Sequence, residues 1–270
     1  MVRTLRSSVL AVSAFLWIGF VDISPAVSVP LSYNTGLEYV TSALSTPQYT
    51  PNHLFPSDTY GPFGSQVSYR QSFDGTALTK QVDVGFVFGP GFSDGQKSAF
   101  RTAAVTGIES IWNNKFMITD TVNNRAFPLT VAVMTAGPVF DQSVTVHSGS
   151  GRADVHNWYA ASATPQVMAH EVGHMIGLYD EYIGGSVDKY PNPTLSNAGL
   201  MGLGANSEKP EMHPRYYQGY LDFMNALNPG GNFILAAVVA PEPSTLFLVV
   251  SGITGLLVSR RLEGFRVRLR

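Results

Sequence analysis

Residues 170–180 of this 270-residue chain read His-Glu-Val-Gly-His-Met-Ile-Gly-Leu-Tyr-Asp. On an α-helix, residues i and i+4 project from the same face, so the spacing of His170 and His174 directs two imidazoles toward one point. Glu171 is displaced by about 100° around the helix, where its carboxylate can reach a metal-bound water without binding the metal. This arrangement predicts a hydrolytic zinc site in which Glu171 is the general base.

A catalytic zinc ion needs a third protein ligand and one position that stays open for water. Asp180 is the leading candidate, because Gly177 can adopt the left-handed conformation that ends a helix and turns the chain back toward the histidines. A metal ion would also offset the unfavourable position of a carboxylate at the negative end of the helix dipole. Glu181 is an alternative ligand if the turn runs differently, and His213 is another.

The pattern HExxHxxGxxD resembles the metzincin clan of zinc endopeptidases, and its final aspartate is similar to the third ligand of snapalysin-type members. The run Asp180-Glu181-Tyr182 is also similar to the segment that follows the histidines of IgA-peptidase-like enzymes, so the subfamily stays open. Metzincins carry a methionine-containing turn beneath the metal. The resemblance assigns this Met-turn to Met201, within residues 196–202, where glycines suit a tight turn.

The surrounding sequence predicts an α+β fold. Alternating and β-branched residues indicate strands, and apolar residues at helical spacing indicate helices. The expected elements are strands over 82–88, 129–135 and 139–147, a helix over 95–116, a turn at Gly137-Pro138, and a zinc helix that begins near Thr164-Pro165. The resemblance to metzincins implies a twisted mixed sheet behind the active-site helix. It also implies an edge strand, within 139–147, that pairs with an extended substrate.

The resemblance implies a secreted zinc endopeptidase that acts on protein or peptide substrates. Zinc would polarise the scissile carbonyl, and Glu171 would take a proton from the attacking water and pass it to the leaving amine. Tyr216 and Tyr217 are candidates for a hydroxyl that stabilises the oxyanion. Two other functions stay open: a non-catalytic, zinc-stabilised component of the extracellular polysaccharide matrix, and a zinc hydrolase of non-peptide substrates.

The N-terminal residues predict export. Residues 1–28 contain Arg3 and Arg6, an apolar run over 9–21, and the small residues Ala26 and Ser28 at the expected cleavage positions. A basic start, an apolar run and small residues before the cut are typical of a secretory signal peptide. The mature chain is therefore expected to cross the inner membrane.

The C-terminal residues predict sorting. Residues 241–270 begin with Pro-Glu-Pro-Ser-Thr, continue with an apolar stretch over 246–258 and end with an arginine-rich tail. This layout resembles a PEP-CTERM sorting signal, which implies an exosortase-type processing enzyme as a partner. The apolar stretch is shorter than the roughly 20 residues of a permanent span. We therefore expect transient insertion in the inner membrane and delivery to the cell surface or extracellular matrix.

Composition limits the remaining possibilities. The chain contains no cysteine, so core packing rather than disulfides must stabilise the exported protein. Residues 29–240 contain ten Lys and Arg against sixteen Asp and Glu, a net charge of −6, which argues against nucleic acid as a partner. The length suits one metallopeptidase domain over 79–240. Residues 29–78, which include the Pro- and Tyr-rich segment 47–64, are expected to be an N-terminal arm or pro-segment.

Overall fold

The computed structural model describes residues 32–48, 59, 61–137, 139–185 and 194–238. The expected signal peptide at 1–28, the sorting signal at 241–270 and much of segment 47–64 lie outside these residues, so their roles stay predictions. The compact unit that begins at Tyr33 is described below. Within the described part of the chain, no helix combines the length and the apolar character needed to cross a membrane.

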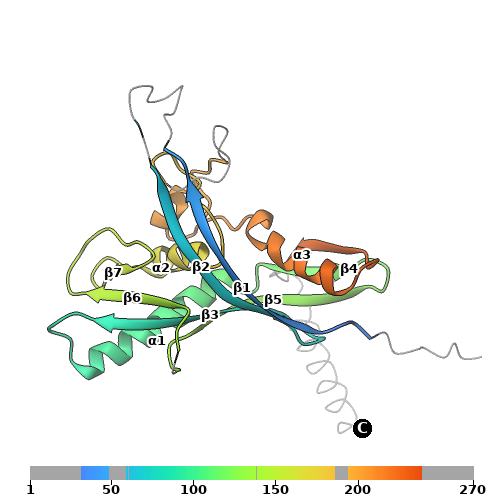
Figure 1. Cartoon of the computed structure of the whole chain (residues 1–270), viewed down its shortest axis with the longest axis horizontal. Coiled ribbons are helices and arrows are strands. Elements are labelled where there is room, and N and C mark those ends of the chain that lie inside the picture. Colours follow the sequence, from blue (N-terminus) through green and yellow to red (C-terminus); the bar gives the residue numbers. More distant parts are fainter. Residues whose placement is uncertain (1–31, 49–58, 60, 138, 186–193, 239–270) are drawn as a thin grey trace, which may run out of the picture. The chain divides into compact units, whose positions relative to one another are not determined.

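The fold is α+β and contains a curled mixed sheet with a few helices (Figure 1). The strands are β1 (Gly36–Thr46), β2 (Phe63–Phe73), β3 (Leu78–Phe88), β4 (Phe116–Asp120), β5 (Arg125–Met134), β6 (Gln142–His147), β7 (Asn157–Tyr159) and β8 (Phe233–Ala237). The helices are α1 (Asp94–Trp112), α2 (Pro165–Met175) and α3 (Gln218–Leu227), with short 3-10 helices at Leu203–Asn206 and Pro214–Tyr217.

The strands are connected around β3. The main path through the sheet is β1-β2-β3-β5-β4-β8, and β6 pairs with β3 and with β7. Pairs β1–β2, β2–β3, β4–β5 and β4–β8 are antiparallel, whereas β3–β5, β3–β6 and β6–β7 are parallel. The first half of β3 pairs with β2 and β5, and its second half pairs with β6. The sheet is therefore mixed, as the sequence predicts.

The predicted elements after residue 79 correspond to α1, α2, β3, β5 and β6, with shifted ends. Helix α1 begins after Ser93, whose side chain and that of Gln96 form a reciprocal capping box. It ends at Trp112 rather than at residue 116, because Asn113 caps it and Asn114 has a φ of 60°. Helix α2 begins at Pro165, after Thr164, whose hydroxyl accepts a hydrogen bond from the backbone of the first turn.

The prediction of an edge strand within 139–147 is wrong for the second half of β6, which has a neighbour on each side. Strand β6 pairs with β3 on one side, and its last three residues, from Thr145 to His147, pair with β7 on the other. The terminal strand at this end of the sheet is therefore β7. The error has a physical reason, because a strand's alternation shows which face is buried but does not show how many neighbours it pairs with.

The expected N-terminal arm contains two strands that the sequence did not reveal. Strand β1 pairs with β2 along the whole length of both, and residues 70–73 of β2 pair with the start of β3. Figure 1 shows the two strands as a long twisted ribbon that extends past the rest of the sheet. Val67, Tyr69 and Phe73 of β2 are buried in the main core. Whether residues 29–78 are removed during maturation stays a prediction.

Helix α2, which carries the two histidines, is held by α1. The indole Nε1 of Trp112 donates a hydrogen bond of 3.0 Å to the carbonyl of Ala169. Gly107 of α1 lies so close to Pro165 that a Cβ at this position would come within 2.9 Å of the proline ring. Apolar residues of α2 are buried on its inner side, among them Met168, Val172 and Met175. The helix is therefore a fixed support for its polar side chains.

Candidate metal centre

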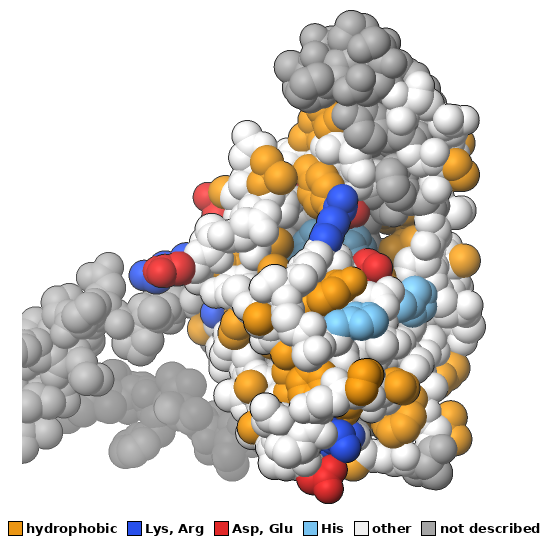
Figure 2. All heavy atoms as spheres, turned by 90° about the vertical axis from the view of Figure 1, so that its left-hand side faces the viewer, with side chains coloured by type: hydrophobic (Ala, Val, Ile, Leu, Met, Phe, Trp, Pro, Cys, Tyr) orange, Lys and Arg blue, Asp and Glu red, His pale blue; other side chains and the backbone are white. Residues whose placement is uncertain are grey.

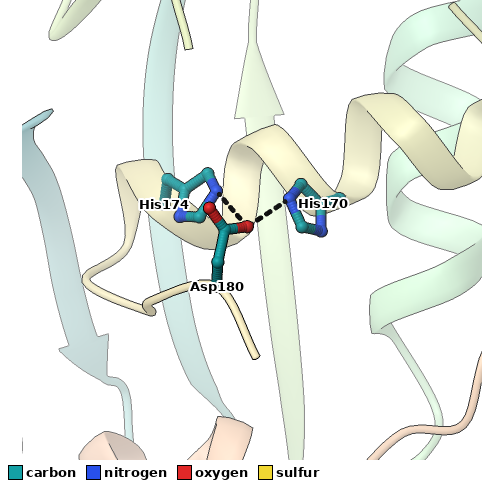
Figure 3. A group of neighbouring side chains, drawn as sticks. All are labelled: His170, His174 and Asp180. Atoms are coloured by element: carbon teal, nitrogen blue, oxygen red, sulfur yellow. Dashed lines mark ion pairs between the residues drawn. The ribbon is translucent and has the colours of Figure 1, made fainter. Parts of the chain in front are cut away.

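His170, His174 and Asp180 converge at one point (Figure 3). The Asp180 Oδ1 atom lies 3.0 Å from Nε2 of His170 and 3.2 Å from Nε2 of His174, and all three side chains are buried. Zinc bonds of about 2.0–2.1 Å in a tetrahedral site place neighbouring ligand atoms about 3.3 Å apart. Two imidazole nitrogens and a carboxylate oxygen are donor atoms that suit a divalent metal ion. The group could hold a metal.

The turn after α2 brings Asp180 to the histidines. Gly177 has a φ of 97°, which a residue with a Cβ rarely adopts. Its N–H donates to the carbonyl of His174 at 3.0 Å, and the N–H of Leu178 donates to the carbonyl of Gly173 at 2.9 Å. This pair of bonds is a Schellman motif, which ends the helix and reverses the chain. The role that the sequence predicts for Gly177 is confirmed.

Backbone carbonyls orient both histidine rings. The Nδ1 atom of His170 lies 2.8 Å from the carbonyl oxygen of Leu200, and that of His174 lies 2.7 Å from the carbonyl oxygen of Leu178. When Nδ1 carries the proton and donates it to a carbonyl, the neutral ring leaves Nε2 free to bind a metal. Both Nε2 atoms face Asp180. The surroundings therefore select the ring nitrogens that a metal site needs.

The charges of the cluster stabilise one another when no metal is present. Burial by itself lowers the pKa of His174, but the hydrogen bond and negative charge of Asp180 outweigh this effect and raise the pKa to about 9. Burial has the opposite effect on Asp180, and its hydrogen bonds with the two histidines hold its pKa below the usual value. A bound cation would replace the positive charge of the protonated imidazole.

Glu171 lies next to the cluster in sequence and is 6% exposed. It lines both cavities that open onto the histidines. Burial raises the pKa of its carboxyl group, and the nearby histidines oppose this rise. A buried carboxylate that faces a cavity beside a metal site can accept a proton from water there. Glu171 thus lies in the cavity walls beside the histidines, and its role as general base stays a prediction.

Met201 is fully buried beneath α2. A Cβ at Gly173, between the two histidines, would overlap the Met201 sulfur and also approach Trp112. The chain turns tightly here, because the N–H of Gly202 donates to the carbonyl of Gly199 at 2.9 Å. The same turn supplies the Leu200 carbonyl that orients His170. Met201 therefore packs against α2 between the two histidines, and its assignment to a Met-turn stays a prediction.

The two alternative third ligands have other partners. Both carboxylate oxygens of Glu181 accept hydrogen bonds from Arg215, at 2.5 and 2.6 Å, and one also accepts from Tyr216 at 2.8 Å. His213 lies 3.3 Å from the hydroxyl of Ser196 and is not part of the histidine-aspartate group. Of the three candidates, only Asp180 has its side chain beside the two histidines.

The tyrosines considered for the oxyanion do not reach the site. The Tyr216 hydroxyl donates to Glu181, and the Tyr217 hydroxyl donates to the carbonyl of Trp112 at 2.6 Å. Neither side chain lines the two cavities beside Glu171. Both residues follow the expected Met-turn in the chain, but their hydroxyls face the interior.

Two adjoining cavities form a cleft across the site. The first has a volume of about 480 Å³ and the second about 500 Å³. They share walls formed by Arg152, Ala153, His170, Glu171 and Tyr182. Figure 2, which views the β6–β7 end, shows basic, acidic and histidine side chains gathered around a hollow in this face.

Two of the shared residues were missed by sequence reasoning. The ring of Tyr182 stacks near that of His170, with 6.3 Å between ring centroids, and its hydroxyl accepts a hydrogen bond of 3.3 Å from Arg152. The position of Tyr182, two residues after the third ligand, was a usable signal. Arg152 has no local motif that could have identified it.

Comparison of the chain with protein families, with curated proteins and with solved structures found no match.

Proposed function

We propose that this protein is a zinc-dependent hydrolase that cleaves peptide bonds. The observation that carries the proposal is the convergence of His170, His174 and Asp180 beside Glu171, on the wall of an open cleft. Three ligands from the protein leave a coordination position open, as catalytic rather than structural zinc sites require. When bound, zinc would polarise a carbonyl and make water a stronger nucleophile at neutral pH.

The side chains of the protein have distinct tasks in this proposal. Glu171 takes a proton from the attacking water and delivers it to the nitrogen of the leaving amine. Its burial in a cavity wall keeps the carboxylate near the reacting atoms and away from bulk water. The carbonyls of Leu200 and Leu178 hold the imidazole rings in place, and Met201 supports the helix between them.

The cleft supports an extended peptide as the substrate. Its walls include the irregular segment 151–155 on one side and Leu44, Gly64 and Ser65 of the β1–β2 hairpin on the other. Among the described residues, the backbone groups of Arg152 and Ala153 make no backbone hydrogen bond. Free N–H and C=O groups along a cleft can pair with an extended chain. This segment replaces β6 as the surface that we propose for substrate pairing.

We also propose that the protein is exported and sorted. This part of the proposal rests on sequence alone, on the signal peptide expected at residues 1–28 and the PEP-CTERM-like tail at 241–270. Hydrolysis would then take place at the cell surface or in the extracellular matrix. Mass spectrometry of the protein isolated from its host would show both cuts, near residues 28 and 241, if the proposal is right.

The test combines metal analysis with digestion of a peptide library. We expect the purified protein to contain zinc and to cleave peptides. Glu171→Gln should retain zinc but lose about 10²- to 10⁴-fold in rate, the usual contribution of a general base. Zinc without cleavage of any peptide would favour a non-catalytic matrix component, and cleavage of other bonds only would favour a non-peptide hydrolase. Failure to bind zinc would overturn the proposal.

A further inference from the structure

Arg152 differs from the other arginines of the described residues in having neither a carboxylate partner nor a position over an aromatic ring. Arg70 pairs with Asp83 and Arg215 pairs with Glu181, whereas Arg101 and Arg125 lie over aromatic rings. Among the described residues, the Arg152 guanidinium donates one hydrogen bond, of 3.3 Å, to the Tyr182 hydroxyl. Its guanidinium therefore has donors that remain available in the cleft.

The nearest carboxylate in sequence does not neutralise Arg152. Asp154 accepts hydrogen bonds from the backbone of His156 and Asn157, at 2.7 and 2.8 Å, and from the side-chain amide of Asn157. These bonds tie the Asp154 carboxylate to the loop that leads to β7. Among the described residues, Asp154 therefore makes no ion pair with Arg152, and the guanidinium in the cleft wall can bind a ligand.

The first cavity has an asymmetric set of charges. Among its described lining residues, Arg152 is the one permanent cation and Glu171 the one carboxylate, and the rest of the wall is His170 with polar or apolar residues, including Ser162, Leu203 and Asn206. The second cavity is lined by the same Arg152 and by three carboxylates, those of Asp154, Glu171 and Asp180. A negative group on a substrate would therefore meet less repulsion in the first cavity, where one carboxylate accompanies Arg152, than in the second, where three carboxylates do.

We propose that Arg152 binds a substrate carboxylate in the first cavity, beside the bond that is cleaved. Arginine recognises carboxylates through paired, charge-assisted hydrogen bonds. The inference rests on the proposed peptidase function and adds the chemical class of the substrate. Residues 29–240 have a net charge of −6, so the overall charge of the protein would disfavour binding of acidic peptides. A preference for acidic peptides would therefore be due to the local positive charge of Arg152.

Tyr182 acts as a positioning residue for Arg152. Its ring stacks near His170, and its half-buried hydroxyl accepts the hydrogen bond from the guanidinium. The aromatic ring thereby connects the metal-binding helix to the cation that selects the substrate. Tyr182→Phe should weaken the selection of carboxylates less than loss of Arg152 does, since the ring remains and only one hydrogen bond is removed.

The experiment separates two sources of the carboxylate, an acidic side chain and the C-terminus of a peptide. The zinc-loaded protein is given end-blocked peptides that differ only in Glu against Gln, at each position around the cut. A second set contains neutral peptides with either a free or an amidated C-terminus. We expect kcat/KM to favour the carboxylate member by about tenfold or more in one of the two sets, as a charge-assisted hydrogen bond allows.

Variants of Arg152 decide the assignment. Arg152→Gln should reduce the preference to near one, and Arg152→Glu should reverse it in favour of a Lys-containing peptide. Arg101→Gln is the matched control, because Arg101 lies on α1 and does not line the cleft, and it should retain the wild-type ratio. A wild-type ratio near one in both sets, or a ratio that Arg152→Gln leaves unchanged, overturns the inference while the peptidase function stands.

Failure of the proposed function would look different. If no peptide is cleaved, the same peptide pairs are tested for binding to the zinc-loaded protein by calorimetry. Tighter binding of the carboxylate member that is lost in Arg152→Gln would retain Arg152 as a carboxylate site without a peptidase. Equal binding of both members would overturn the carboxylate site as well.

Discussion

Asp180 and Glu181 are adjacent carboxylates with different partners. Asp180 contacts both histidines, and Glu181 pairs with Arg215 and Tyr216 behind the site. Both residues follow the turn that ends α2, and adjacent side chains in non-helical backbone can point to opposite sides. One therefore belongs to the metal centre, and the other holds the loop that supports it.

This division predicts opposite effects of two conservative substitutions. Asp180→Asn should reduce zinc affinity by about tenfold or more, because it removes a charged ligand. Glu181→Gln should retain zinc but lower the free energy of unfolding by about 1–3 kcal/mol, because it weakens charged hydrogen bonds. Zinc titration and urea denaturation of both variants measure the two effects. If Glu181→Gln lost zinc and Asp180→Asn retained it, Glu181 would be the ligand and Asp180 would have the structural role.

The ion pair between His174 and Asp180 predicts how pH affects the metal-free protein. The pKa of His174 is raised from 6.5 to about 9, so its stabilising effect is full below pH 6.5 and is lost as the pH rises toward 9. The pKa of Asp180 is lowered from 3.8, so its effect is present above pH 3.8 and is lost as the pH falls through the lowered pKa. The metal-free protein should therefore lose stability between pH 6.5 and 9, as measured by urea denaturation.

Zinc binding should follow the same titration with the opposite sign. Because zinc needs a neutral imidazole, binding below pH 9 must release the His174 proton, and the apparent affinity should increase with pH. Calorimetry in two buffers with different ionisation enthalpies measures the proton directly. An observed heat that is the same in both buffers would show that no proton leaves.

At the scale of elements, the end of α2 decides whether the ligands meet. Its C-terminal turn depends on the left-handed conformation of Gly177, which positions both Asp180 and the Leu178 carbonyl. A change in this turn would move two parts of the site together. A substitution in this turn therefore tests whether the end of the helix and the metal centre depend on each other.

Gly177→Ala should lower the free energy of unfolding by about 1–2 kcal/mol, the cost of a Cβ in left-handed backbone, and should weaken zinc binding. Gly95→Ala is the matched control, because Gly95 lies in the first turn of α1 and a Cβ there meets no atom within 4 Å. That change should leave stability equal or slightly increased. Thermal denaturation of both variants, with and without zinc, makes the comparison. Equal effects at the two glycines would show that the turn at Gly177 has no special role.

At the scale of the whole molecule, the β1–β2 hairpin contributes both to the core and to the cleft. Val67, Tyr69 and Phe73 are buried in the same cluster as the residues of α2. Leu44 and Ser65, from the same hairpin, line the second cavity. A domain boundary at residue 79 would lie within β3 and would remove this side of the sheet.

A chain that begins at Thr79 should therefore be far less stable than one that begins at Val29. Loss of three large buried side chains removes several kcal/mol of apolar burial, at about 1.5–3 kcal/mol for each. Circular dichroism melting of the two chains, both ending at Ala240, tests this expectation. If the shorter chain melts at the same temperature, the hairpin is an accessory segment, as expected of an arm or pro-segment.

Local features of the sequence predicted the centre of the site well. The positions of His170 and His174, the start of α2 at Thr164-Pro165 and its end at Gly177 depend on the chain within a few residues. Such features follow from helical geometry, capping and backbone conformation. The α+β character of the fold follows in the same way from alternation and helical spacing.

Pairing between distant segments could not be predicted in this way. Strand β1 has only two buried residues, Leu44 and Thr46, at its C-terminal end, so its pattern carries little signal. The position of β6 inside the sheet depends on β7, which has three residues. A short strand or an exposed one is stabilised by its neighbours rather than by its own sequence pattern.

The sequence by itself determined that two histidines and a glutamate share one helix, and that a glycine ends that helix, because these properties arise from local backbone geometry. Only the tertiary structure decided which of Asp180, Glu181 and His213 faces the histidines and which carbonyls orient the rings. It also decided that Arg152 lies in the cleft. These choices depend on contacts between segments far apart in the chain, whose relative positions are set by the packing of the core.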